Sequence, residues 1–86
     1  MTHYFEVYYN RDYRSWCLLH RDENGDDLEE SQWFHYKRDA MNGAINSAHA
    51  LMDQGESAML TFENQTGTTS SQVSPKMFWS AWKNSQ

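Results

Sequence analysis

The stretch from Arg38 to Gln54 has the periodicity of an amphipathic helix, and this feature most constrains the fold. Its apolar residues recur at three- and four-residue spacing and form one stripe, made of Ala40, Met41, Ala44, Ile45, Ala48, Leu51 and Met52. Asp39 complements the positive end of the helix dipole, and Gly55 stands where a left-handed C-terminal cap is usual. Because the stripe is rich in alanine, the helix can approach a sheet closely.

The rest of the chain shows short segments of alternating polarity, which predict strands. Two precede the helix and are joined by a turn, so we expect a hairpin. A third, less regular segment follows the hairpin, and two more follow the helix. The predicted strands are Tyr4 to Tyr9, Arg14 to Arg21, Gln32 to Tyr36, Ala58 to Glu63 and Thr68 to Val73. Ser74 and Pro75 have the form of an N-cap and a first helical residue, which predicts a short helix from Lys76 to Lys83.

These segments predict an α+β fold. We expect a small antiparallel sheet of about four to five strands with the main helix packed on one face. The predicted order is β-β-(β)-α-β-(β) plus a short C-terminal helix. A chain of 86 residues is too short for two independent cores, so residues 1–86 are expected to form a single domain.

The net charge of −5 restricts the classes of partner. Binding to phosphates usually needs clustered Lys and Arg, and the seven basic residues here are scattered, so direct nucleic-acid binding is disfavoured. The same charge disfavours an anionic membrane surface. No segment has the pattern of a signal peptide or the length of a membrane span, and Cys17 has no partner for a disulfide. We therefore expect a cytoplasmic protein without membrane association.

No motif in the sequence indicates catalysis, a metal site or a cofactor. Cys17 and His20 are three residues apart on a predicted strand, so they should point to opposite faces. The histidines lack the spacing of metal ligands, and no glycine-rich phosphate loop is present. We expect a protein that is not an enzyme. A thiol nucleophile at Cys17 is the remaining enzymatic alternative.

An acidic segment lies between the second and third predicted strands. Its six carboxylates are Asp22, Glu23, Asp26, Asp27, Glu29 and Glu30. The alternation of Asp22, Asn24 and Asp26 is similar to the start of a calcium loop, but the glycine and the bidentate glutamate of that motif are misplaced. The segment could meet a basic surface of a partner, or it could only keep the protein soluble.

Aromatic residues make up 15% of the chain, which is more than the small predicted core needs. Once the core is filled, Tyr4, Tyr8, Trp33, Trp79 and Trp82 remain as candidates for exposure, which is typical of an interface. Alternatively, the last helix caps the open sheet face and buries Trp79 or Trp82, within one chain or across a dimer. We predict that the six acidic residues together with Trp33, Trp79 and Trp82 bind a partner protein.

The segment from Phe34 to Val73 resembles small uncharacterised bacterial and phage proteins. The likeness lies in Asp39-Ala40, in the spacing of Ala44 and Ala48, and in the strand after Gly55. In size, acidity and lack of a catalytic motif the chain is also similar to phage-encoded anti-CRISPR proteins. That similarity implies an inhibitor that masks a nucleic-acid-handling complex. The alternative is a self-associating, homodimeric structural protein.

Overall fold

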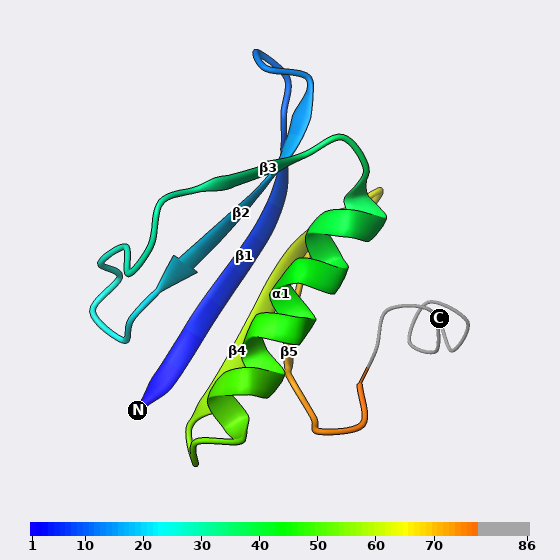
Figure 1. Ribbon diagram of the computed structural model, residues 1–86. Helices are drawn as coiled ribbons and strands as arrows, with labels where there is room; N and C mark the ends of the chain where they lie inside the picture. Colours follow the sequence, from blue (N-terminus) through cyan, green and yellow to red (C-terminus); the bar gives the residue numbers. More distant parts are fainter. Residues whose placement is uncertain (78–86) are drawn as a thin grey trace.

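The computed structural model describes residues 1–77, and this part of the chain begins with a β-hairpin (Figure 1). Strand β1 (Thr2–Asn10) pairs antiparallel with β2 (Ser15–Arg21). The connecting turn is held by a hydrogen bond from the Tyr13 backbone N–H to Asn10 Oδ1, and Arg14 has a positive φ of 50°. The predicted hairpin is therefore confirmed.

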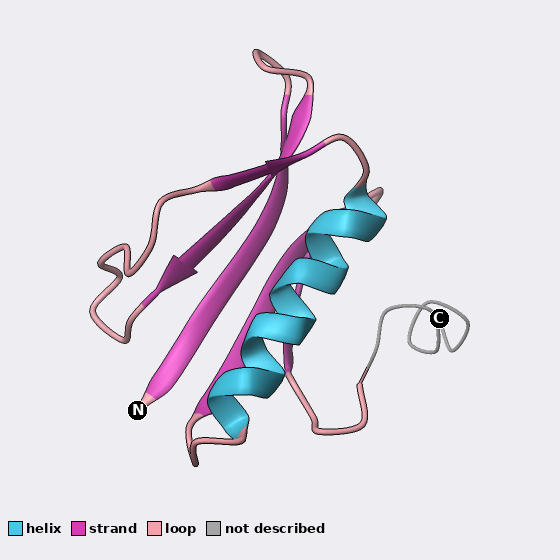
Figure 2. Cartoon of the chain, in the orientation of Figure 1, coloured by secondary structure: helices cyan, strands magenta, loops and turns pink. Residues whose placement is uncertain are grey.

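The remaining elements follow in the predicted order, within a few residues of the predicted bounds. They are β3 (Gln32–Phe34), α1 (Lys37–Met52), β4 (Ser57–Asn64) and β5 (Gly67–Gln72). Figure 2 shows the single helix lying across one face of the sheet. The α+β class and the single main helix are confirmed for residues 1–77. Of the predicted C-terminal helix, Lys76 and Met77 are described and are not helical, and the rest lies outside the described residues.

The sheet is mixed, so the prediction of a purely antiparallel sheet was wrong. Its strand order is β3-β2-β1-β4-β5, and β1 runs parallel to β4, with Thr2 opposite Ser57 and Val7 opposite Phe62. In Figure 1, β1 (blue) and β4 (yellow-green) lie side by side although they are far apart in the sequence. Helix α1 connects β3 with β4 by crossing the sheet, and a crossover of this kind makes β4 run in the same direction as β3.

Helix α1 ends as the sequence predicts. Gly55 has a φ of +88°, the left-handed conformation that glycine adopts without steric cost. The Gly55 N–H donates to the Met52 carbonyl, and the Glu56 N–H donates to the Leu51 carbonyl. These two bonds form a Schellman motif, which satisfies the last helical carbonyls and turns the chain into β4.

The core lies between α1 and the sheet. The helix contributes Ala40, Met41, Ala44, Ile45 and Ala48, and the strands contribute Phe5, Val7, Leu18, Ala58, Leu60 and Phe62, all of them buried. Burying each of the larger side chains contributes roughly 1.5–3 kcal/mol. Trp16 and Phe34 pack at the edge of this cluster. Among residues 1–77, no helix has the length and apolarity needed to cross a membrane.

Candidate functional site

The sheet has a second face, opposite α1, on which no helix or strand of residues 1–77 packs. We call it the open face. Because side chains alternate along a strand, the residues between the core positions point to this face. The cross-strand register aligns them in rows, and they are Tyr4, Glu6, Tyr8, Cys17, Leu19, Arg21, Trp33, Met59 and Thr61. The open face is thus a mixed surface of aromatic, apolar and charged groups.

Residues 22–30, which we call the acidic loop, extend from the end of β2 beside the open face. Asp22 organises the first part, because its Oδ1 atom accepts hydrogen bonds from the backbone N–H groups of Asn24 and Asp26. Gly25 supplies a positive φ of 85° at the tip. Arg21 and Asp27 form an antiparallel bridge across this turn. The Asp22 carboxylate therefore serves the geometry of the turn, a local role that Asp residues often have.

Arg21 links the acidic loop to the open face. Its Nε atom lies 3.0 Å from Asp27 Oδ1, and its Nη1 atom lies 3.1 Å from Glu6 Oε2. The hydrogen bond with Asp27 and the charge of Glu6 raise the pKa of Arg21. One of the six acidic residues of the loop is thus neutralised by a basic neighbour.

Apart from Asp22 and Asp27, the carboxylates of the acidic loop divide into two groups. Glu23 accepts a hydrogen bond from the Thr2 N–H, and Glu29 Oε2 lies 2.7 Å from His20 Nδ1. Asp26 and Glu30 are exposed, and their carboxylates make no hydrogen bond or ion pair within residues 1–77. These two side chains are the ones most available to a partner.

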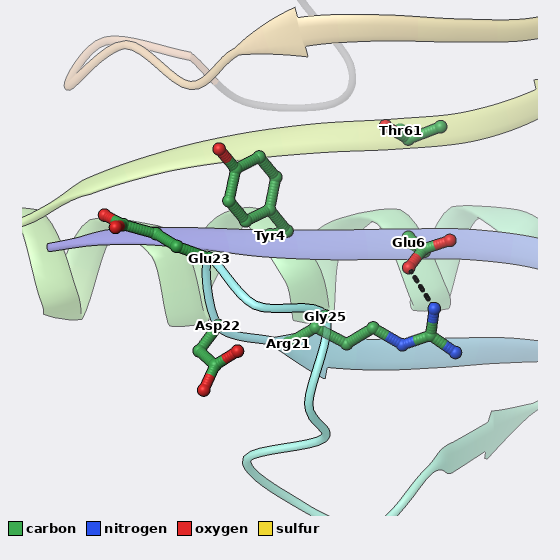
Figure 3. A pocket seen from close by; sticks show the side chains of 7 residues that line it. All are labelled: Tyr4, Glu6, Arg21, Asp22, Glu23, Gly25 and Thr61. Atoms are coloured by element: carbon green, nitrogen blue, oxygen red, sulfur yellow. Dashed lines mark ion pairs between the residues drawn. The ribbon is translucent and has the colours of Figure 1, made fainter.

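A shallow hollow of about 220 Å³ lies where the acidic loop meets the open face. Figure 3 shows this face with α1 behind the strands, and the ion pair between Glu6 and Arg21 crosses the hollow's floor. Tyr4 forms an aromatic wall, while Asp22 and Glu23 extend from the loop. The lining carries three carboxylates and one guanidinium, so the hollow favours a cationic or hydrogen-bonding group.

Trp33 forms a second, more apolar part of the open face. This residue is 45% exposed, and its ring makes an edge-to-face contact with the Tyr13 ring at a centroid distance of 5.1 Å. These two rings and Ser15 line a hollow of about 310 Å³. Cys17 lies opposite both Trp33 and Tyr8 in the sheet register and is fully buried. The prediction that Cys17 and His20 face opposite sides is confirmed, because His20 stacks on the core residue Phe5.

A chain of four titratable side chains crosses the core side of the sheet. Glu56 Oε2 lies 2.8 Å from His3 Nε2, His3 Nδ1 lies 2.8 Å from His20 Nε2, and His20 Nδ1 contacts Glu29. His3 is 5% exposed. The sequence patterns did not reveal this chain, since its members come from four separate segments. His3 and His20 both occupy inward-facing positions on paired strands, and a prediction of the strand register could have used this pattern to bring them together.

The predicted site residues are thus partly brought together. The six acidic residues lie in one loop, and Trp33 lies on the adjacent strand β3, whereas Trp79 and Trp82 lie outside the described residues. Within residues 1–77, no group of three or more His, Cys, Asp or Glu side chains could hold a metal ion. No family model, curated protein or solved structure matches the chain significantly. The functional conclusions therefore rest on the residues of this chain.

Proposed function

We propose that this chain is a non-enzymatic binding protein that contacts a partner protein through its open face and the acidic loop. One observation carries the proposal. Exposed rings lie on a sheet face on which no described element packs, and the acidic loop that carries Asp26 and Glu30 borders this face. Aromatic residues such as Trp33, Tyr13 and Tyr4 are typical anchors of protein interfaces, because they bury much area with few rotatable bonds.

Charge indicates the chemistry of the partner. Within residues 1–77 the carboxylates of Asp26 and Glu30 form no ion pair, and the whole chain carries a net charge of −5. A basic surface on the partner would complement this loop and accelerate association. The sharper form of the proposal is that the partner is a nucleic-acid-handling complex and that the acidic loop masks its basic groove. The compositional similarity to anti-CRISPR proteins supports this form.

The proposal is tested by reversing only the two unpaired acids. The variant Asp26→Lys/Glu30→Lys leaves the internal contacts of Asp22, Glu23, Asp27 and Glu29 intact. The matched control is Asp12→Lys/Asp53→Lys, which makes the same change in net charge at exposed residues outside the acidic loop. A partner is first isolated from lysate and purified, and its dissociation constant is then measured for each variant by calorimetry.

We expect the loop variant to bind roughly 10- to 100-fold more weakly, as loss of two complementary charges at an interface can cause. The control should bind within about twofold of the unmodified protein. Equal affinities of the two variants would contradict the proposal, because the position of the carboxylates would then make no difference to binding. Trp33→Ser separates the aromatic contribution, because it removes the exposed ring and leaves the acidic loop unchanged. An unaltered affinity of this variant would show that the Trp33 ring on β3 is not part of the interface.

A further inference from the structure

Strand β5 forms one edge of the sheet, and within residues 1–77 this edge lacks the usual protection against pairing. Sheet edges are commonly blocked by lysine, proline, a bulge or a short strand. The register of β5 with β4 is continuous from Met59–Gln72 to Asn64–Gly67, so it contains no bulge. The strand reads Gly-Thr-Thr-Ser-Ser-Gln, with neither a charge nor a proline.

The hydrogen-bonding direction of β5 follows from one bond. The Val73 N–H donates to the Ala58 carbonyl at 2.9 Å, so Val73 points its backbone groups toward β4. Backbone groups alternate along an antiparallel strand, and Thr68, Ser70 and Gln72 therefore point theirs away from β4. Within residues 1–77 these outward N–H groups have no acceptor, and the only contact to their carbonyls is a 3.4 Å bond from Ser71 Oγ to Gln72.

We propose that β5 pairs antiparallel with β5 of a second copy of this chain around a two-fold axis through Ser70. The outward residues then form the hydrogen-bonded pairs Ser70 with Ser70, and Thr68 with Gln72 of the second copy. The pairing joins two five-stranded sheets into one of ten strands. It uses a strand edge and not the open face, so it is independent of the proposed function.

Charge selects a second copy as the occupant of this edge. A two-fold contact places each residue near its own copy, so a charged edge would repel itself. The stretch 64–75 contains no charged side chain, although the whole chain carries −5. The opposite edge is unsuitable, because β3 has three residues and directly follows the acidic loop. Among the two edges, only β5 meets itself without repulsion.

The first test is Ser70→Pro, measured by analytical ultracentrifugation over a range of concentrations. Proline lacks the N–H that would bond the second copy, but this N–H is not used for pairing with β4, so the fold is kept. We expect the unmodified chain and the control Ser70→Ala to form dimers and Ser70→Pro to remain monomeric. Thermal unfolding of the proline variant confirms that it is folded.

The second test is oxidative cross-linking, which reports the register. Cα atoms of a hydrogen-bonded pair lie about 5.5 Å apart, within disulfide range, so Ser70→Cys should cross-link in high yield. Thr68→Cys is the matched control, because the two copies of residue 68 are separated by about four residue rises, roughly 13 Å. A monomeric unmodified chain, a dimeric Ser70→Pro variant or equal cross-linking of both cysteines would overturn the proposal. Binding of a foreign extended peptide to the β5 edge of a monomer would also overturn it.

Discussion

The Nδ1 atom of His3 lies 2.8 Å from the Nε2 atom of His20, and each ring uses its other nitrogen to bond a glutamate. Each neutral imidazole has one N–H donor and one acceptor nitrogen, so the tautomers of the two rings decide which atoms donate in these contacts. The pair therefore acts as one unit that links β1, β2, the acidic loop and the start of β4.

Removal of His3 tests how much this unit stabilises the fold. The variant His3→Leu leaves His20 Nε2 and the Glu56 carboxylate without a partner on the core side of the sheet. We expect the free energy of unfolding to fall by about 1–3 kcal/mol, measured by urea denaturation. Glu29→Gln is the control, since its side chain is 54% exposed and water can replace the lost bond. If both variants lost the same free energy of unfolding, the contacts of His3 would stabilise the fold no more than the exposed contact of Glu29 does.

A hydrogen bond with the Cys17 thiol is the main cause that raises the pKa of Tyr8 above its ordinary value of 10.0, and desolvation adds to it. The folded protein therefore holds this proton at a pH where the unfolded chain has lost it. The stabilisation is complete below pH 10.0 and is lost as the pH rises through the raised pKa. In a titration of tyrosinate absorbance, Cys17→Ala should lower this pKa and Tyr8→Phe should remove the late step. An unchanged titration of Cys17→Ala would contradict the assigned cause.

Cys17 is fully buried even though it belongs to the open face, because it lies in register between Trp33 and Tyr8. We expect its thiol to resist a thiol reagent in the native protein and to react after denaturation. Trp33→Ala should make the native thiol react faster, since it removes the large ring that lies opposite Cys17 in the sheet register. Tyr36→Ala removes a more exposed ring just beyond β3 and serves as the control. Equal reaction rates in both variants would show that Trp33 does not cover Cys17.

Gly43 lies in the interior of α1, where the helix passes over Phe34. A methyl group at this position would lie 3.3 Å from Phe34 Cζ and 3.5 Å from Leu18 Cδ2. Alanine in a helix interior is favoured over glycine by about 1 kcal/mol, but this contact opposes the gain. We expect Gly43→Ala alone to stabilise the protein by less than that amount. In a Phe34→Leu background the same change should give the full gain, as measured by a double-mutant cycle of unfolding free energies. Additive effects of Gly43→Ala and Phe34→Leu on the unfolding free energy would show that a methyl group at position 43 does not press against Phe34.

Local patterns predicted most of the secondary structure because the signals for it are local. The stripe from Ala40 to Ala48 and the glycine at position 55 define α1 within a few residues of its observed ends. Strand pairing depends instead on how the chain crosses the sheet. The sequence order of the strands does not reveal that β4 returns beside β1, so the parallel pair was missed.

The candidate site was predicted in composition but not in detail. The six acidic residues and Trp33 could be found from sequence because a dense run of charge and a surplus of rings are visible there. Their separate roles depend on distant residues. Arg21 forms an ion pair with Asp27, the Thr2 N–H donates to Glu23, and His20 contacts Glu29. Only tertiary structure distinguishes these carboxylates from Asp26 and Glu30.

The central position of β1 also affects how the chain acquires its fold during synthesis. Strand β1 leaves the ribosome before the other strands of this sheet and becomes its middle strand, and its partner on one side, β4, is made only after α1. Until Asn64 has emerged, the backbone groups on that side of β1 stay unpaired, and the apolar face of the β1–β2 hairpin lacks its cover of α1 and β4. Such pairing between distant segments slows folding. The nascent hairpin is therefore the stage at which this chain is most exposed to aggregation and to chaperones.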